Sequence, residues 1–135
     1  MGRKKVSIVI VLFIVCIGIL AAVIINDYRS FTPEKWLEEP DKRYVIVKNM
    51  VKKYDFGNMT REQVISLLGE TEKDRKAVGF ALRNDGTGPI VQLDSPNSMV
   101  YYTKTGRTPE EYRGFYLLFD DNGKVVDYAI IRFTT

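Results

Sequence analysis

With 135 residues, the chain is long enough for one ordinary domain and too short for two well-buried ones. It contains no histidine, and its one cysteine, Cys16, lies in a hydrophobic segment, which excludes His-containing catalytic triads and leaves the rest of the chain without a thiol nucleophile or a disulfide. Three of the twenty basic residues precede that segment, so seventeen basic residues remain against seventeen acidic ones, and this neutral remainder lacks the charge of a nucleic-acid-binding domain.

The N-terminal part of the chain has the features of a membrane anchor. Residues 6–25 carry no charge, and at about 1.5 Å per helical residue they match a hydrocarbon core of about 30 Å. A core helix of a soluble domain would show a polar face, whereas only Ser7, Cys16 and Gly18 interrupt this aliphatic run. We therefore expect residues 1–25 to form a basic cytoplasmic tail and a single transmembrane helix.

The charges that flank this segment predict its orientation. Arg3, Lys4 and Lys5 precede it, whereas Asp27 and Arg29 follow it. The positive-inside rule then leaves the N-terminus in the cytoplasm. The predicted location is the cell membrane, with the C-terminal domain on the extracytoplasmic side.

Cleavage, lipidation and myristoylation are the alternatives to an uncleaved anchor. Ala21 and Ala22 are small enough for a signal-peptide cleavage site, although the apolar run continues beyond them. Cys16 is a candidate for lipidation, but it lies in mid-segment and Val15 precedes it where a lipobox needs a small residue. Myristoylation requires Ser or Thr at the position of Val6. We prefer an uncleaved anchor with a membrane-buried cysteine.

Residues 26–31 are expected to form a short polar linker, in which Tyr28 and Phe31 suit the membrane interface. The domain of residues 32–135 then begins with helical signals. Thr32 is a candidate N-cap, and the proline and the acid that follow it favour the first turn of a short helix. Pro40 is expected to end that helix.

Asp41 is expected to cap a second helix. Apolar residues recur there at helical spacing, and they are Val47, Met50, Val51 and Tyr54. The other face carries Lys48, Asn49, Lys52 and Lys53. This is the pattern of an amphipathic helix that packs on a core.

The strongest local signal is the start of a third helix. Thr60 and Gln63 have the spacing of a capping box, and Met59 and Val64 that of a hydrophobic staple. Its apolar stripe consists of Val64, Ile65, Leu67 and Leu68. Gly69 follows where a C-terminal cap with positive φ is needed.

After the third helix the pattern changes to strands. Residues 77–82 and 90–93 are β-compatible runs on either side of the turn-rich residues 84–88, which predicts a first hairpin. Residues 99–103 predict a further strand, followed by a loop in which Glu110 and Glu111 favour a helical turn.

The last hairpin is the clearest β signal. Residues 121–123, Asp-Asn-Gly, supply the residues that tolerate positive φ between strands at 114–119 and 125–133. The order of helices followed by antiparallel strands predicts an α+β fold, with short helices packed on one face of a β-meander.

Several of these residues together resemble a known family. The residues that carry the resemblance are Gly57, Met59, Thr60, Gln63, Val64, Leu67, Leu68 and Gly69, then Tyr101 and Tyr102, and then Leu117, Phe119, Asp120, Gly123, Lys124 and Val125. From about Pro40 to the C-terminus, the chain resembles the SmpA/OmlA (BamE-like) small lipoprotein domains, with a transmembrane anchor in place of the lipobox.

That resemblance implies a helix pair packed on a three-stranded antiparallel sheet, a fold to which the β-lactamase-inhibitor proteins are also similar. It implies a non-enzymatic extracytoplasmic module that binds proteins. The role of its best-known members in outer-membrane assembly is not carried over, because a transmembrane anchor keeps the domain at the inner or only membrane.

Four tyrosines form the candidate protein-interaction surface, namely Tyr101, Tyr102, Tyr112 and Tyr116. Adjacent strand residues point to opposite faces, so one of Tyr101 and Tyr102 leaves the core unless both faces of the sheet are covered. Exposed tyrosines favour interfaces. The alternative is a tyrosine half-buried under a helix with its hydroxyl in water.

No catalytic, cofactor-binding or metal-binding residue is predicted. Asp120 and Asp121 lie at a hairpin, where acids usually solvate a turn, and residues 84–88 lack the further residues of a phosphate-binding or calcium-binding loop. The predicted function is a membrane-anchored protein-binding accessory module of the cell envelope that is not an enzyme and needs no cofactor. An inhibitor or sensor of another envelope protein is the alternative, and a membrane-bound hydrolase is a more remote one.

Overall fold

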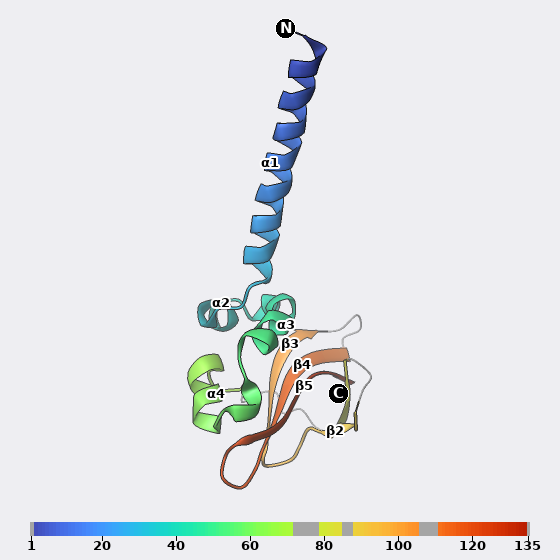
Figure 1. Cartoon of the computed structure of the whole chain (residues 1–135). Helices are drawn as coiled ribbons and strands as arrows, with labels where there is room; N and C mark the ends of the chain where they lie inside the picture. Colours follow the sequence, from blue (N-terminus) through green and yellow to red (C-terminus); the bar gives the residue numbers. More distant parts are fainter. Residues whose placement is uncertain (1, 72–78, 85–87, 106–110, 135) are drawn as a thin grey trace. The chain divides into compact units, whose positions relative to one another are not determined.

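The computed structural model of the chain describes residues 2–71, 79–84, 88–105 and 111–134 (Figure 1). It separates into two compact units, Met1–Ser30 and Phe31–Thr135.

The first unit is the helix α1, Arg3–Arg29. Its 27 residues are all exposed, and the helix is long and apolar enough to cross a membrane. The helix predicted at residues 6–25 is therefore confirmed, but the linker predicted at 26–31 is wrong. Residues 26–29 complete the last turn of α1, and the Phe31 side chain is fully buried in the second unit.

The second unit begins with the helices α2, Pro33–Glu38, and α3, Arg43–Lys53, separated by the 3-10 turn η1, Pro40–Lys42. The Thr32 side chain accepts a hydrogen bond from the Lys35 amide at 3.2 Å, which confirms the predicted N-cap of α2. The predicted cap of the next helix is wrong. Asp41 lies inside η1, and α3 begins after Lys42 without a side-chain cap, because the chain enters α3 directly from the 3-10 turn.

The 3-10 turn η2, Phe56–Asn58, leads to α4, Arg61–Leu68, where the predicted capping box is confirmed. The Thr60 hydroxyl accepts from the Gln63 amide at 3.2 Å, and the Thr60 amide donates to the Gln63 side chain at 2.9 Å. Gly69 ends α4 with φ +77°, which a glycine adopts without strain.

The strands are β1, Phe80–Arg83; β2, Val91–Gln92; β3, Ser98–Thr105; β4, Glu111–Phe119; and β5, Val125–Thr134. They form one antiparallel sheet in the order β2-β1-β5-β4-β3 (Figure 1). The predicted first hairpin corresponds to β1 and β2, although residues 77–78 and 85–87 lie outside the described residues. Glu111 starts β4, so the helical turn predicted there is wrong, and Glu110 lies outside the described residues.

The final hairpin forms as predicted between β4 and β5. Gly123 has φ +76°, and the Asp120 carboxylate accepts the backbone amides of Asn122 and Lys124, both at 2.9 Å. Asp120 therefore stabilises the turn, as the sequence indicated.

The curled sheet has a separate hydrophobic core on each of its two faces. Helices cover the first face, and the helix-side core is built around Phe31, Trp36, Met50, Phe56, Val64, Tyr101, Phe115 and Leu117. The second core lies on the opposite face, where β1 and β2 contribute, and consists of Ala81, Val91, Leu93, Tyr102, Tyr116, Ile131 and Phe133. The chain thus has the predicted α+β class, with a sheet that is covered on both sides.

Candidate functional site

The structure buries three of the four tyrosines predicted to form an interaction surface. Tyr101, Tyr102 and Tyr116 are 2%, 8% and 3% exposed, and Tyr112 is half-buried. Tyr101 belongs to the helix-side core, whereas Tyr102 and Tyr116 belong to the second core. Both faces of the sheet are covered, so the exposed tyrosine patch that was expected is not formed by these residues.

The Tyr101 hydroxyl donates a hydrogen bond to the Gly69 carbonyl oxygen at 2.7 Å and thereby links β3 to the end of α4. Burial raises the pKa of Tyr101 well above its usual value of 10, and the nearby Glu70 carboxylate acts in the same direction. Burial also raises the pKa of Tyr116, with a further contribution from Asp127. Both tyrosines are held neutral and serve the packing of the sheet.

The hairpin of β1 and β2 is joined to β5 by an ion pair between Arg83 and Asp127. The two side chains are 15% and 35% exposed, and the Arg83 Nε also donates to the Pro89 carbonyl oxygen at 3.2 Å. Arg83 thus ties together three backbone segments. These contacts hold the β1–β2 hairpin, which contributes to the second core, against β5.

Arg43, which is buried, is also structural. Its guanidinium donates to the Trp36 carbonyl oxygen at 2.8 Å and to the Tyr102 carbonyl oxygen at 3.5 Å, and it lies 4.8 Å from the centre of the Trp36 ring. The contact with Tyr102 places a side chain on the backbone of the edge strand β3. Such contacts blunt the tendency of an edge strand to pair with another chain.

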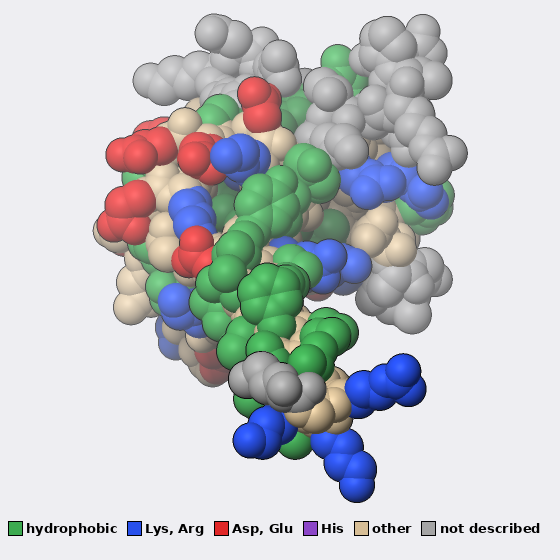
Figure 2. Space-filling view, turned by 90° about the horizontal axis from the view of Figure 1, so that it is seen from above, with side chains coloured by type: hydrophobic (Ala, Val, Ile, Leu, Met, Phe, Trp, Pro, Cys, Tyr) green, Lys and Arg blue, Asp and Glu red, His purple; other side chains and the backbone are tan. Residues whose placement is uncertain are grey.

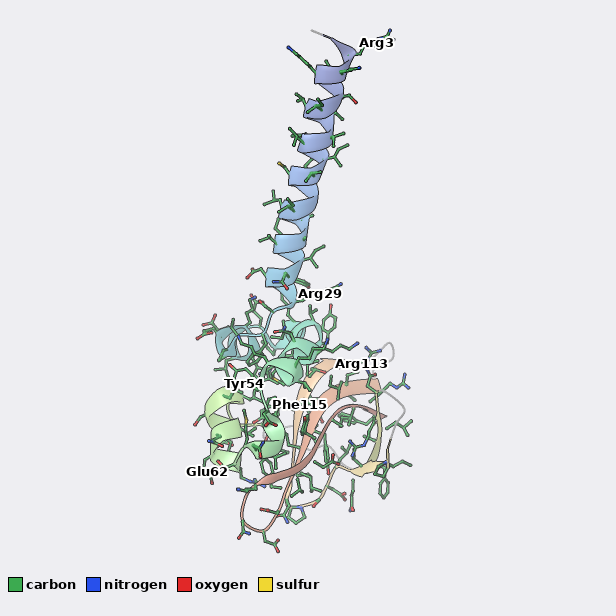
Figure 3. The ribbon with its side chains drawn as sticks, in the orientation of Figure 1. Arg3, Arg29, Tyr54, Glu62, Arg113 and Phe115 are labelled. Carbon is green, nitrogen blue, oxygen red and sulfur yellow. The ribbon has the colours of Figure 1, made fainter. Side chains whose placement is uncertain are left out.

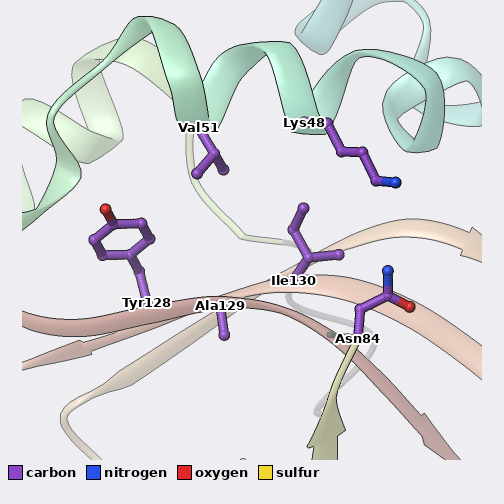
Figure 4. Close-up of a pocket in the computed structure, with 6 residues that line it drawn as sticks. All are labelled: Lys48, Val51, Asn84, Tyr128, Ala129 and Ile130. Atoms are coloured by element: carbon purple, nitrogen blue, oxygen red, sulfur yellow. The ribbon is translucent and has the colours of Figure 1, made fainter. Parts of the chain in front are cut away.

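An open groove of about 460 Å³ lies between α3 and the helix-side face of β5 (Figure 4). Lys48 and Val51 of α3 line one wall, Tyr128 and Ile130 of β5 form the floor, and Asn84 lies at the end of β1. Ala129 also lines the groove, but Figure 4 shows its methyl group pointing away from α3. The groove therefore has an apolar floor with an ammonium and an amide at one end.

The sheet face continues from this groove to a pair of arginines. Arg132 is two residues beyond Ile130 on β5, so both side chains emerge on the same face. Arg132 is directly opposite Arg113 of β4 in the register of the sheet. Neither guanidinium forms an ion pair with a described residue. Like charges directly opposite each other destabilise a sheet, and no described acid offsets this repulsion.

Exposed apolar side chains border the same face. In β1, Ala81 is buried while its neighbours Phe80 and Leu82 are 69% and 55% exposed, and Leu82 is the register partner of Arg132. Ile90, which directly precedes β2, is 60% exposed. The outer side of the β1–β2 hairpin is thus apolar where it adjoins the basic end of β5.

Charge is unevenly distributed over this domain despite its formal neutrality. The helix α3 contains Lys48, Lys52 and Lys53 as exposed residues and no acid, whereas α2 and η1 carry exposed acids, namely Glu34, Glu38 and Asp41. Figure 2 shows the acidic side chains gathered on the left of the domain, with basic side chains among them, and further basic side chains on the right. Arg113 lies on the opposite side of the domain from Glu62 of α4 (Figure 3).

We name the surface formed by the groove and the arginine pair the basic groove, and its residues are Lys48, Val51, Asn84, Arg113, Tyr128, Ile130 and Arg132. A second hollow is lined mainly by residues of α4, including Glu62 and Leu67, together with Met59 just before that helix. Among the described ranges, no cluster of His, Cys, Asp or Glu is suited to hold a metal ion.

Sequence reasoning missed the basic groove. It assigned Lys48 to a solvated helix face and gave no role to Arg113 or Arg132, because the register that brings these residues together is a property of the folded sheet. The absence of acids from the second helix was the one local signal that was available.

Comparison with protein families, with curated proteins and with solved structures finds no match for this chain. The resemblance to the SmpA/OmlA family therefore stays a prediction, and the chemistry of the basic groove has to be judged from its own residues.

Proposed function

We propose that this chain is a membrane-anchored, extracytoplasmic, non-enzymatic module that binds another protein of the cell envelope. The observation that carries the proposal is the basic groove, an open surface that combines an apolar floor with two arginines that form no ion pair with a described residue. Tyrosine and arginine are among the residues that contribute most to protein interfaces, and the basic groove contains Tyr128 and the arginine pair.

The proposed location rests on α1 and on the charges at its ends. The helix is long and apolar enough to span a bilayer, and Arg3, Lys4 and Lys5 precede its uncharged stretch. By the positive-inside rule these residues favour a cytoplasmic N-terminus, which places the domain outside.

The lining of the groove favours binding over chemistry. Its polar groups are the Lys48 ammonium, the Asn84 amide and the Tyr128 hydroxyl. These groups form hydrogen bonds and charge contacts with a bound chain, but catalysis by proton transfer would require an acid and a base that converge on one point.

We also propose a relationship of fold to the SmpA/OmlA domains. Strands β3, β4 and β5 follow one another as an antiparallel meander, and the helix-side core joins α2, α3 and α4 to one face of it. This arrangement supports the proposal, and the β1–β2 hairpin is an addition to it.

Crosslinking in intact cells tests the proposed function. A photo-crosslinking amino acid at position 82, beside the basic groove, should capture one recurring envelope protein. Position 37 is the matched control, because Leu37 is also a leucine, is 53% exposed and lies on the acidic side of the domain. No protein captured at position 82, or the same protein captured equally at both positions, would contradict the proposal.

Protease treatment tests the proposed topology separately. A protease added outside intact cells or spheroplasts should remove the domain of residues 31–135 and leave the N-terminal tail inside. Protection of the domain would reverse the orientation.

A further inference from the structure

We propose that the basic groove binds an extended acidic segment of the partner protein, with one apolar side chain in the groove and a carboxylate two residues further along at the arginine pair. This inference rests on the proposed function and specifies the chemistry of the partner.

The like charges of Arg113 and Arg132 favour an acidic partner. Directly opposed residues in an antiparallel sheet have Cα atoms about 4.5–5.5 Å apart, so the two guanidinium groups share one patch of surface. Each lacks an ion-pair partner among the described residues, and Lys48 adds a third positive charge beside Ile130. A carboxylate from another chain would relieve the repulsion and accept hydrogen bonds from both arginines.

The groove favours a peptide over other anions, because the positive charge alone would bind any anion. Val51, Tyr128 and Ile130 give the groove an apolar wall and floor. Exposed Leu82 extends this apolar surface along β1. A partner that only carried phosphates would leave these side chains in water, whereas a peptide with an apolar residue would cover them.

The spacing between Ile130 and Arg132 predicts the spacing of the partner's side chains. Ile130 and Arg132 lie on the same face of β5, two residues apart, which corresponds to about 6.6 Å along a strand. An extended peptide also repeats its side-chain direction every two residues, at the same rise. The predicted recognition pattern is therefore an apolar residue, any residue and then an acid, with a second acid allowed two positions later.

The side-chain amide of Asn84 is suited to bind the backbone of the partner peptide. Its side chain is exposed and lies at the same end of the groove as Lys48 (Figure 4). An amide both donates and accepts hydrogen bonds, which suits the backbone of an extended peptide.

Binding of synthetic peptides to the full chain in nanodiscs of neutral lipid tests the inference. The probe is a fluorescent peptide with the repeating pattern Leu-Ser-Glu-Ser-Glu, and fluorescence anisotropy measures its affinity. We expect measurable binding that weakens when the salt concentration rises from about 0.05 to 0.5 M. A peptide with glutamine in place of glutamate should bind at least about tenfold more weakly.

The matched variants are Arg113→Gln/Arg132→Gln, which removes the arginine pair, and Lys42→Gln/Lys124→Gln, which removes the same charge from exposed positions outside the basic groove. The first should weaken peptide binding about tenfold, and the second by less than about twofold. Thermal unfolding checks that both variants fold, and the first is expected to fold well because it relieves a repulsion.

Three results would overturn the inference. They are equal binding of the glutamate and glutamine peptides, equal losses in the two double variants, and tighter binding of polyphosphate than of the peptide. If crosslinking at position 82 still captures a protein in cells while Arg113→Gln/Arg132→Gln changes neither that capture nor peptide binding, the proposed function stands and the acidic partner is excluded.

Discussion

The two faces of the sheet differ in how completely they are covered. On the second face, the β1–β2 hairpin leaves Tyr102 and Tyr116 only 8% and 3% exposed. On the helix-side face, Phe115 is fully buried, whereas Arg113, two residues away on the same strand, is only partly buried. The comparison indicates that the aromatic residues of the two cores stabilise the fold, while the basic end of the helix-side face is the surface that we propose binds a partner.

The largest effects are expected from the two cores. Phe115→Ala and Ile131→Ala each delete a fully buried side chain, one on each face, and should lower the free energy of unfolding by about 3–5 and 2–5 kcal/mol, respectively. Urea denaturation of the full chain in detergent micelles measures both. Leu82→Ala is the control, because its exposed side chain should cost less than about 0.5 kcal/mol. A loss for Ile131→Ala as small as that of the control would mean that the second face is not sealed.

Removal of the Arg83–Asp127 pair should have the next largest effect. Arg83→Met leaves a partly buried carboxylate without its partner and should cost about 1–3 kcal/mol. A double-mutant cycle with Asp127→Asn measures the coupling between the two side chains. If the two single losses simply add, the pair does not hold the β1–β2 hairpin on β5.

Alkaline pH should lower the free energy of unfolding through the two buried tyrosines, Tyr101 and Tyr116. The pKa values of Tyr101 and Tyr116 are raised in the folded protein, so both tyrosines stay neutral there while they ionise near pH 10 in the unfolded chain. Their contribution to stability is complete below pH 10 and is lost as the pH rises through the folded pKa values. Urea unfolding at increasing pH measures this loss, which should shrink in Tyr101→Phe/Tyr116→Phe. An unchanged pH profile in that variant would show that other groups are responsible.

The smallest effect on stability is expected at the arginine pair, and it should be favourable. Arg132→Glu replaces a like-charged cross-strand pair by an opposite-charged one and should raise the free energy of unfolding by about 0.2–1 kcal/mol. The same change should abolish binding of the acidic peptide. A variant that is destabilised would indicate that Arg132 has a structural partner, and one that still binds the peptide would place the peptide elsewhere.

Local features of the fold were predictable because they depend on neighbouring residues. The capping box of Thr60 and Gln63, the cap at Thr32 and the turn at Gly123 are all formed as their sequences indicated. The errors also have local causes. The polar residues after position 25 continue α1 as a last turn, and the 3-10 turn at Pro40–Lys42 takes the position where an Asp41 cap was expected.

The candidate site was not predictable because it depends on contacts between distant segments. The tyrosines were expected at a surface on the assumption that the sheet has one covered face, but the β1–β2 hairpin provides a second cover. In the same way, the juxtaposition of Arg113 with Arg132 and of Lys48 with Ile130 requires the strand register and the packing of α3. Arg43 is buried against Trp36, which a hydrophobicity pattern cannot indicate for an arginine.

The most direct test of the central claim is an NMR titration of the full chain in micelles with the acidic peptide. The account predicts changes in the amide signals of residues around the basic groove, namely Lys48, Asn84, Arg113, Ile130 and Arg132, with little change at Tyr102, Tyr116 or the residues of α2. Changes confined to α2 and α4, or no changes at all, would contradict it.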